Sequence, residues 1–157
     1  MDEDASERQP PPLPVTWRPR NMRLVGYALA ALIVLTMVAL AVVLPDDWRL
    51  SDRLGLAALG VVGAGGLHLL ARPRLQATET RVTVVNCIRT HVLEWPEILD
   101  ARMPIGEPWP TVDLADGSTL GVMGIQSNDG DRARRALEDF RLLLRARGEA
   151  EEPRPPQ

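Results

Sequence analysis

Two uncharged apolar runs in the first half of the chain constrain its structure most. The first run, Leu24–Leu44, has 21 residues, and the second, Leu54–Ala71, has 18 residues. About 20 apolar residues in a helix cross a hydrocarbon core about 30 Å thick. Both runs therefore predict transmembrane helices, and a wholly water-soluble single-domain enzyme is not expected.

The connection between the runs, Pro45–Arg53, is short enough to predict an antiparallel hairpin over residues 24–71, with both termini on one side of the membrane. Arginines gather at the outer ends of the hairpin, and only two lie in the connection. The outer arginines are Arg18, Arg20 and Arg23 before the first run and Arg72, Arg74 and Arg81 after the second. All 18 basic residues of the chain are arginine, a bias that suggests a GC-rich bacterial genome. The positive-inside rule then predicts a two-span protein of the bacterial plasma membrane with both termini in the cytoplasm.

A cleaved signal peptide is the main alternative for the first run, with Ala39–Ala41 as the small-residue cleavage site. The segment before the run is long and partly acidic, and Val42, Val43 and Leu44 continue the apolar run beyond that site. Both features favour a retained helix over a signal peptide.

Small residues predict close packing of helices in the membrane. Gly26 and Ala30 lie near the start of the first run, and Gly60 and Ala64 lie in the second. Small side chains let helix backbones approach closely in lipid. They suit either packing within the hairpin, which we favour, or packing between two copies of the chain.

His68 is the one Asp, Glu, His, Lys or Arg side chain inside either run. Intramembrane ionisable residues often serve proton or ligand sites. Because His68 lies one helical turn from Arg72, its ring can also reach headgroups or water, and we favour that interpretation.

Both ends of the chain are predicted to be polar tails. Residues 1–23 carry Pro10, Pro11, Pro12 and Pro14, which disfavour helix and strand, so this segment is expected to be disordered, as is the acidic segment 149–157. Trp17 and Trp48 flank the first span, where interfacial tryptophans are expected.

Residues 72–148 have the patterns of a small β-rich domain with 11 acidic residues and 11 arginines. Short alternating stretches predict strands at 81–85, 90–95 and 98–103, and a hairpin over Thr111–Met123 with Asp116-Gly117 in a type I′ turn. The final element is an amphipathic helix that is capped near Ser127–Asp129 and ends at Gly148. Its predicted apolar face comprises Ala133, Ala136, Leu137, Phe140, Leu143 and Leu144.

The order of these elements carries a family resemblance. The stretch from Arg81 to Thr90, the step Leu93-Glu-Trp-Pro-Glu-Ile98, the Asp116-Gly117 hairpin and the closing helix resemble the bacterial pleckstrin-homology-like (PH) domain. With the two spans before it, the chain is similar over about residues 24–147 to small actinobacterial membrane proteins of the low-molecular-weight protein antigen type. The resemblance implies an α+β fold, in which a transmembrane hairpin precedes a bent antiparallel sheet that is capped by a C-terminal helix.

Composition argues against several functional classes. One cysteine, Cys87, and two histidines do not build a cysteine cluster or a histidine metal cage, and the net charge of −3 gives no electrostatic case for nucleic acid. No nucleophile–base pattern or phosphate loop is present, so we expect neither enzymatic activity nor a cofactor. Cys87 is interpreted as a small packing residue.

The favoured function is a membrane-anchored PH-like module for protein interaction or scaffolding at the cytoplasmic face, with a protein partner or self-association. The alternative is recognition of the membrane surface or a lipid headgroup, since eukaryotic PH domains use a basic cluster in their first hairpin. The candidate contact residues are Arg72, Arg74, Arg81, Trp95 and Trp109. For Trp95, a core position is the preferred assignment.

Overall fold

The structure is a computed structural model, and it describes residues 9–148. The chain divides into two compact units. One is the helical segment Arg20–Pro73, and the other combines the residues up to Pro19 with those from Arg74 onward. The second unit is therefore made from two pieces of chain on either side of the first.

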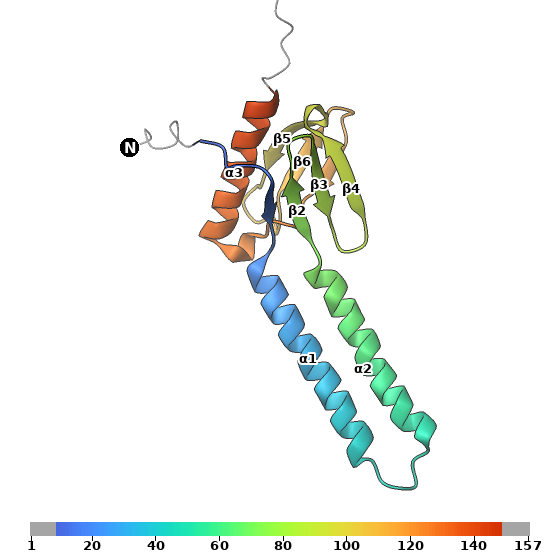
Figure 1. Cartoon of the computed structure of the whole chain (residues 1–157). Helices are drawn as coiled ribbons and strands as arrows, with labels where there is room; N and C mark the ends of the chain where they lie inside the picture. The colour runs from blue at the N-terminus through green and yellow to red at the C-terminus, as the bar shows by residue number, and fades with distance from the viewer. Residues whose placement is uncertain (1–8, 149–157) are drawn as a thin grey trace, which may run out of the picture. The chain divides into compact units, whose positions relative to one another are not determined.

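The helical unit is a pair of antiparallel helices, α1 (Arg20–Val43) and α2 (Leu50–Ala71) (Figure 1). Both are long and apolar enough to cross a membrane. Small residues lie between them. Gly26 and Ala30 are buried in α1, and a Cβ added at Gly60 would lie 3.0 Å from the Met37 Cβ. The small residues thus serve packing within the hairpin, as favoured from the sequence.

The turn between the helices is closed by Arg53. Its guanidinium donates to the carbonyl oxygens of Ala41 at 3.1 Å and Leu44 at 2.8 Å, with a further bond to Pro45 at 3.2 Å. The last carbonyls of a helix have no partner within the helix, and a cation there also complements the helix dipole. Arg53 therefore completes the end of α1 from the first turn of α2.

The β-rich unit contains, within the described residues, two antiparallel sheets. The first has the order β1-β2-β3-β4, with β1 at Val15–Trp17, β2 at Arg74–Ala77, β3 at Arg81–Val85 and β4 at Thr90–Glu94. The second has the order β5-β6-β7, with β5 at Ile98–Arg102, β6 at Thr111–Leu114 and β7 at Thr119–Gly121. Helix α3 (Asp131–Gly148) closes the unit.

Strand β1 corrects the prediction of a disordered segment 1–23. Val15, Thr16 and Trp17 pair with Ala77, Gln76 and Leu75 of β2. Figure 1 shows β1, in dark blue, beside β2. The pairing lies across the whole helical unit, so no local pattern indicates it. Residues 1–8 and the predicted tail 149–157 lie outside the described residues.

Trp17 also differs from its predicted place at the membrane interface. Its ring packs edge-on against the Phe140 ring of α3, with centroids 5.9 Å apart. Strand β1 thus places an aromatic ring against the core, and Trp17 is not one of the tryptophans that could contact a bilayer surface.

The core of the β-rich unit lies between the two sheets and α3. The whole predicted apolar face of α3 is buried. Its partners include Leu75, Val82, Val84, Leu93, Trp95, Ile98, Val112, Val122 and Ile125. Backbone passes close to backbone at Gly124, where an added Cβ would lie 2.2 Å from the Leu75 nitrogen.

The hairpin between β6 and β7 forms as predicted, but with another turn. Gly117 has φ of +82°, whereas no residue other than glycine has a positive φ in the described chain. A type I′ turn needs positive φ at both central residues. The Gly117 nitrogen instead donates to the Leu114 oxygen at 2.9 Å, so Ala115 and Asp116 are the central residues of the turn. Both keep a negative φ, and Gly117 follows them in the left-handed region.

Candidate functional site

The register of the first sheet separates the three predicted contact arginines. Arg74 begins β2 and lies opposite Val85, whereas Arg81 begins β3 and lies opposite Glu94. These positions are at opposite ends of the sheet. Arg72 is the C-cap residue of α2. Arg72 and Arg74 are therefore neighbours along the chain, and Arg81 does not join them.

We call one end of this sheet the helix-attached end, because α1 follows β1 there and α2 leads into β2 there. It consists of Trp17–Pro19, Arg72–Arg74 and the turn Val85–Thr90. These residues include four arginines, Arg18, Arg72, Arg74 and Arg89, and no carboxylate. The charge of this end is thus uniformly basic along its strands and connections.

The turn between β3 and β4 is held firmly at this end. The Asn86 nitrogen donates to the Arg89 oxygen at 2.9 Å. The Asn86 side chain donates to the Gly121 oxygen at 2.8 Å and accepts from the Met123 nitrogen at 3.1 Å. These bonds tie the turn to the segment after β7, yet Ile88 at its tip is 81% exposed.

The opposite end of the sheet has mixed charge. Glu79 forms an ion pair with Arg147, and the Glu94 nitrogen donates to the Glu97 carboxylate at 2.6 Å. Arg81 lies here, next to the turn closed by the bond from Thr78 Oγ1 to the Arg81 oxygen. Carboxylates and arginines alternate at this end, in contrast to the helix-attached end.

The two candidate tryptophans occupy different environments. Trp95 is 6% exposed, its Nε1 donates to the Thr78 oxygen at 3.1 Å, and its ring lies 6.4 Å from that of Phe140. This is the core position preferred from the sequence. Trp109 is half-buried and lies against Gly121, where an added Cβ would meet its Nε1 at 2.9 Å.

The free edges of the two sheets differ in accessibility. On β5, the Ala101 oxygen accepts a bond from Arg141 Nε of α3 at 2.5 Å, so this backbone acceptor of the edge is already occupied. Within residues 9–148, strand β4 pairs with β3 only. Because Asn86 and Arg89 form a hydrogen-bonded pair, the alternation of an antiparallel ladder turns the backbone groups of Thr90 and Val92 away from β3. Val92 is 57% exposed at this open edge.

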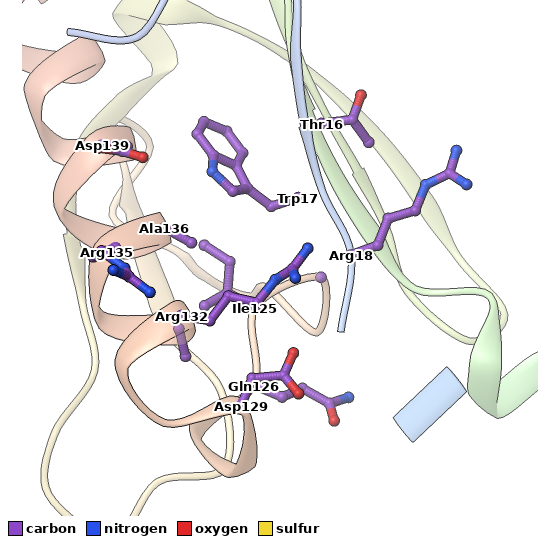
Figure 2. A pocket seen from close by; sticks show the side chains of 12 residues that line it. Thr16, Trp17, Arg18, Ile125, Gln126, Asp129, Arg132, Arg135, Ala136 and Asp139 are labelled. Carbon is purple, nitrogen blue, oxygen red and sulfur yellow. The ribbon is translucent and has the colours of Figure 1, made fainter. Parts of the chain in front are cut away.

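A small pocket of about 230 Å³ lies between β1 and α3 (Figure 2). Trp17 and Ala136 form its apolar wall, and Arg132 and Asp139 contribute charges of both signs. Basic and acidic groups mix here, and no nucleophile is positioned beside a base. Among residues 9–148, no group of three or more histidine, cysteine or carboxylate side chains could hold a metal ion.

The remaining singled-out side chains have ordinary partners. Cys87 Sγ lies 3.7 Å from Met123 Sδ. His68 Nδ1 lies 3.2 Å from the Tyr27 hydroxyl oxygen on the facing helix, a partner that sequence reasoning missed. Hydrogen bonds from the Ser118 hydroxyl and nitrogen hold the pKa of the Asp116 carboxyl below its ordinary value of 3.8. None of these groups forms a catalytic arrangement.

Comparison with known proteins agrees with this architecture. The model of the bacterial PH domain family matches residues 72–143. Uncharacterized protein Rv1417 of Mycobacterium tuberculosis strain H37Rv is 36% identical over 135 residues, which cover 83% of this chain and 88% of that protein. Proteins MT1460 of M. tuberculosis strain CDC 1551 and Mb1452 of Mycobacterium bovis match to the same extent. No solved structure matches the chain.

The chain therefore belongs to the bacterial PH domain family and is similar to these mycobacterial proteins over most of its length. Its two antiparallel sheets and closing helix form an α+β PH-like fold, as expected from the sequence. The family match begins at Arg72, and β1 lies outside it.

Proposed function

We propose that this protein is a non-catalytic, membrane-anchored PH-like module that binds protein at the cytoplasmic face of the plasma membrane. The observation that carries the proposal is the insertion of α1 and α2 between β1 and β2 of the PH-like unit. Two covalent connections to a membrane hairpin restrict the unit more than a single tether would. An anchored unit of this kind suits scaffolding.

The distribution of apolar side chains in the helices supports insertion in lipid. Leu35 is 68% exposed and Val62 is 71% exposed, whereas Gly26 and Gly60 are buried between the helices. In water such an exposed apolar surface would be unfavourable, and in a bilayer it is the expected arrangement. The arginines at the outer ends support cytoplasmic termini.

The open edge of β4 is the surface that best fits a protein partner. An extended peptide, or a second copy of the chain, adds to such an edge by main-chain hydrogen bonds. The β5 edge is less suitable because Arg141 occupies its Ala101 oxygen.

Headgroup recognition of the eukaryotic kind is less well supported. The connection between the first two strands, which carries the basic cluster in eukaryotic relatives, is here the helical unit itself. Arg81 at the start of β3 and Arg89 in the turn after β3 lie at opposite ends of that strand, so these two arginines form no basic cluster.

Membrane topology is tested with single cysteines in the full chain after Cys87→Ser. Asp47→Cys in the connection between the helices is expected to react with an impermeant thiol reagent in intact cells. Thr80→Cys in the exposed β2–β3 turn is expected to react only after lysis. Reaction of Thr80→Cys in intact cells would show that the topology is the reverse of the one proposed.

Partner binding is tested with a photocrosslinking residue at Thr90 on the β4 edge in native membranes. We expect an adduct that Val92→Pro abolishes, because proline removes an outward N–H while leaving the β3 ladder intact. Val92→Thr is the matched control and keeps the adduct. An adduct that forms equally in the Val92→Pro variant would exclude strand addition at this edge.

A further inference from the structure

We propose that the β3–β4 tip, residues Asn86–Arg89, contacts the anionic surface of the bilayer that holds α1 and α2, with the Ile88 side chain inserted among the lipids. This inference rests on the proposed membrane anchoring and adds a third attachment to the two covalent ones. The contact would set how the PH-like unit is oriented on the membrane.

The strand register places the tip at the helix-attached end. Val85 lies opposite both Arg74 of β2 and Thr90 of β4. Only Arg18 and Pro19 separate β1 from α1, and only Arg72 and Pro73 separate α2 from β2. Two intervening residues leave three Cα–Cα steps, at most about 11 Å, so chain connectivity alone keeps each helix end near the strand to which it is joined.

The tip presents an apolar side chain on a fixed support. Ile88 is 81% exposed, and the two side-chain bonds of Asn86 hold the turn against the segment after β7. A single exposed apolar side chain is common on protein surfaces. Ile88 lies at the end of the sheet to which the apolar helices are joined, where the proposed bilayer would supply an apolar environment.

The charge of the neighbourhood favours an anionic surface. Arg89 follows Ile88 directly, and Arg18, Arg72 and Arg74 belong to the same end. The opposite end has mixed charge, with Glu79, Glu94 and Glu97 beside Arg81 and Arg147. Basic residues close to a membrane are attracted by the negative potential of its cytoplasmic leaflet, so this asymmetry turns the helix-attached end toward it.

The test uses the full chain after Cys87→Ser, reconstituted in vesicles of phosphatidylcholine and phosphatidylglycerol. Spin labels are placed at Ile88→Cys, at Thr80→Cys in the turn at the other end of β3, and at Val61→Cys in the middle of α2. The ratio of collision rates with oxygen and with a water-soluble nickel chelate reports the depth of each label.

We expect the Val61 label to be deep in lipid, the Ile88 label to be at the interface and the Thr80 label to be in water. A lipid-embedded Val61 label combined with equal ratios at Ile88 and Thr80 would overturn the tip contact alone. A Val61 label in water would overturn the anchoring itself, and the tip contact with it.

A second measurement keeps the native isoleucine. A label at Thr90→Cys, beside the tip, is compared in the Ile88, Ile88→Leu and Ile88→Asp backgrounds. Ile88→Asp is expected to raise the nickel collision rate at least twofold, whereas Ile88→Leu leaves it unchanged. An unchanged rate in Ile88→Asp would show that the tip does not touch the bilayer.

Discussion

The two units of this protein place the same aliphatic residues in opposite ways. In α1 and α2 the large apolar side chains point outward, with Leu35 and Val62 more than two-thirds exposed, and small residues lie inside. In the PH-like unit Leu75, Val82 and Phe140 are fully buried. Under the proposed anchoring, the difference means that the helical unit is stabilised by close backbone packing in lipid, whereas the PH-like unit is stabilised by removing apolar surface from water.

The largest expected effect is in the PH-like unit, where added volume at Gly124 should destabilise the fold more than added volume at a glycine of the helical unit. In Gly124→Val the new Cβ would lie 2.2 Å from the Leu75 nitrogen and 2.4 Å from the Arg74 carbonyl carbon, both backbone atoms that cannot move aside. Overpacking of this kind costs about 3 kcal/mol or more of unfolding free energy. Denaturant titration in micelles, followed by tryptophan fluorescence, measures it. Thr80→Ala, at an exposed turn, should stay within about 0.5 kcal/mol of the parent.

Removal of the β1 anchor is expected to have the next largest effect. Trp17→Ala deletes the ring that packs on Phe140, and we expect a loss of about 2–3 kcal/mol, below the range for a fully buried tryptophan because Trp17 is half-buried. A double-mutant cycle with Phe140→Leu should give a coupling of about 0.5–1.5 kcal/mol. Additive effects would show that β1 does not pack as described.

In the helical unit, a larger side chain at the helix–helix contact is expected to change the spacing of the two helices. Gly60→Leu pushes against Met37 Cβ, which already lies 3.0 Å from an added Cβ, and should separate the helices. The readout is disulfide formation between Ile33→Cys and Gly63→Cys after Cys87→Ser, which we expect to fall several-fold. Gly65→Leu is the matched control, since nothing lies within 4 Å of its added Cβ. Equal disulfide yields in the two variants would contradict this packing.

The smallest expected effect is electrostatic and confined to the PH-like unit. The pKa of Asp116 is lowered in the folded state by its bonds from Ser118. Its contribution to stability is thus present above the unfolded pKa and is lost as the pH falls through the folded value, below 3.8. The difference in Tm between the parent and Asp116→Asn should be small at pH 7 and shrink toward pH 3. A difference that grows with acidity would have the wrong sign.

Local periodicity was sufficient to predict both apolar helices, strands β3 to β7 and the buried face of α3. In each case the pattern repeats over several residues, as in Ala133, Leu137 and Phe140 of α3. The type of the β6–β7 turn was missed because Asp116-Gly117 also fits a turn in which glycine alone takes positive φ.

Strand β1 could not be predicted in the same way. Val15–Trp17 is three residues long, lies between Pro14 and Pro19, and finds its partner only beyond the helical unit. The positions of the candidate contact residues in the sheet could not be predicted for the same reason. Arg74 and Arg81 are close in sequence, yet an antiparallel strand pair places them at opposite ends of a sheet. Residue spacing does not show this until the register is known.

The place of β1 has a consequence for the order of events during synthesis. The ribosome releases β1 before either helix, and its partner β2 only after both. Because Trp17 pairs with Leu75, the first sheet cannot be completed until the apolar hairpin has left the exit tunnel and α1 and α2 have come together. Formation of the helix pair brings the two ends of this long connection close, which lowers the entropy cost of closing it. In this protein, folding outside the membrane is expected to wait for assembly inside it.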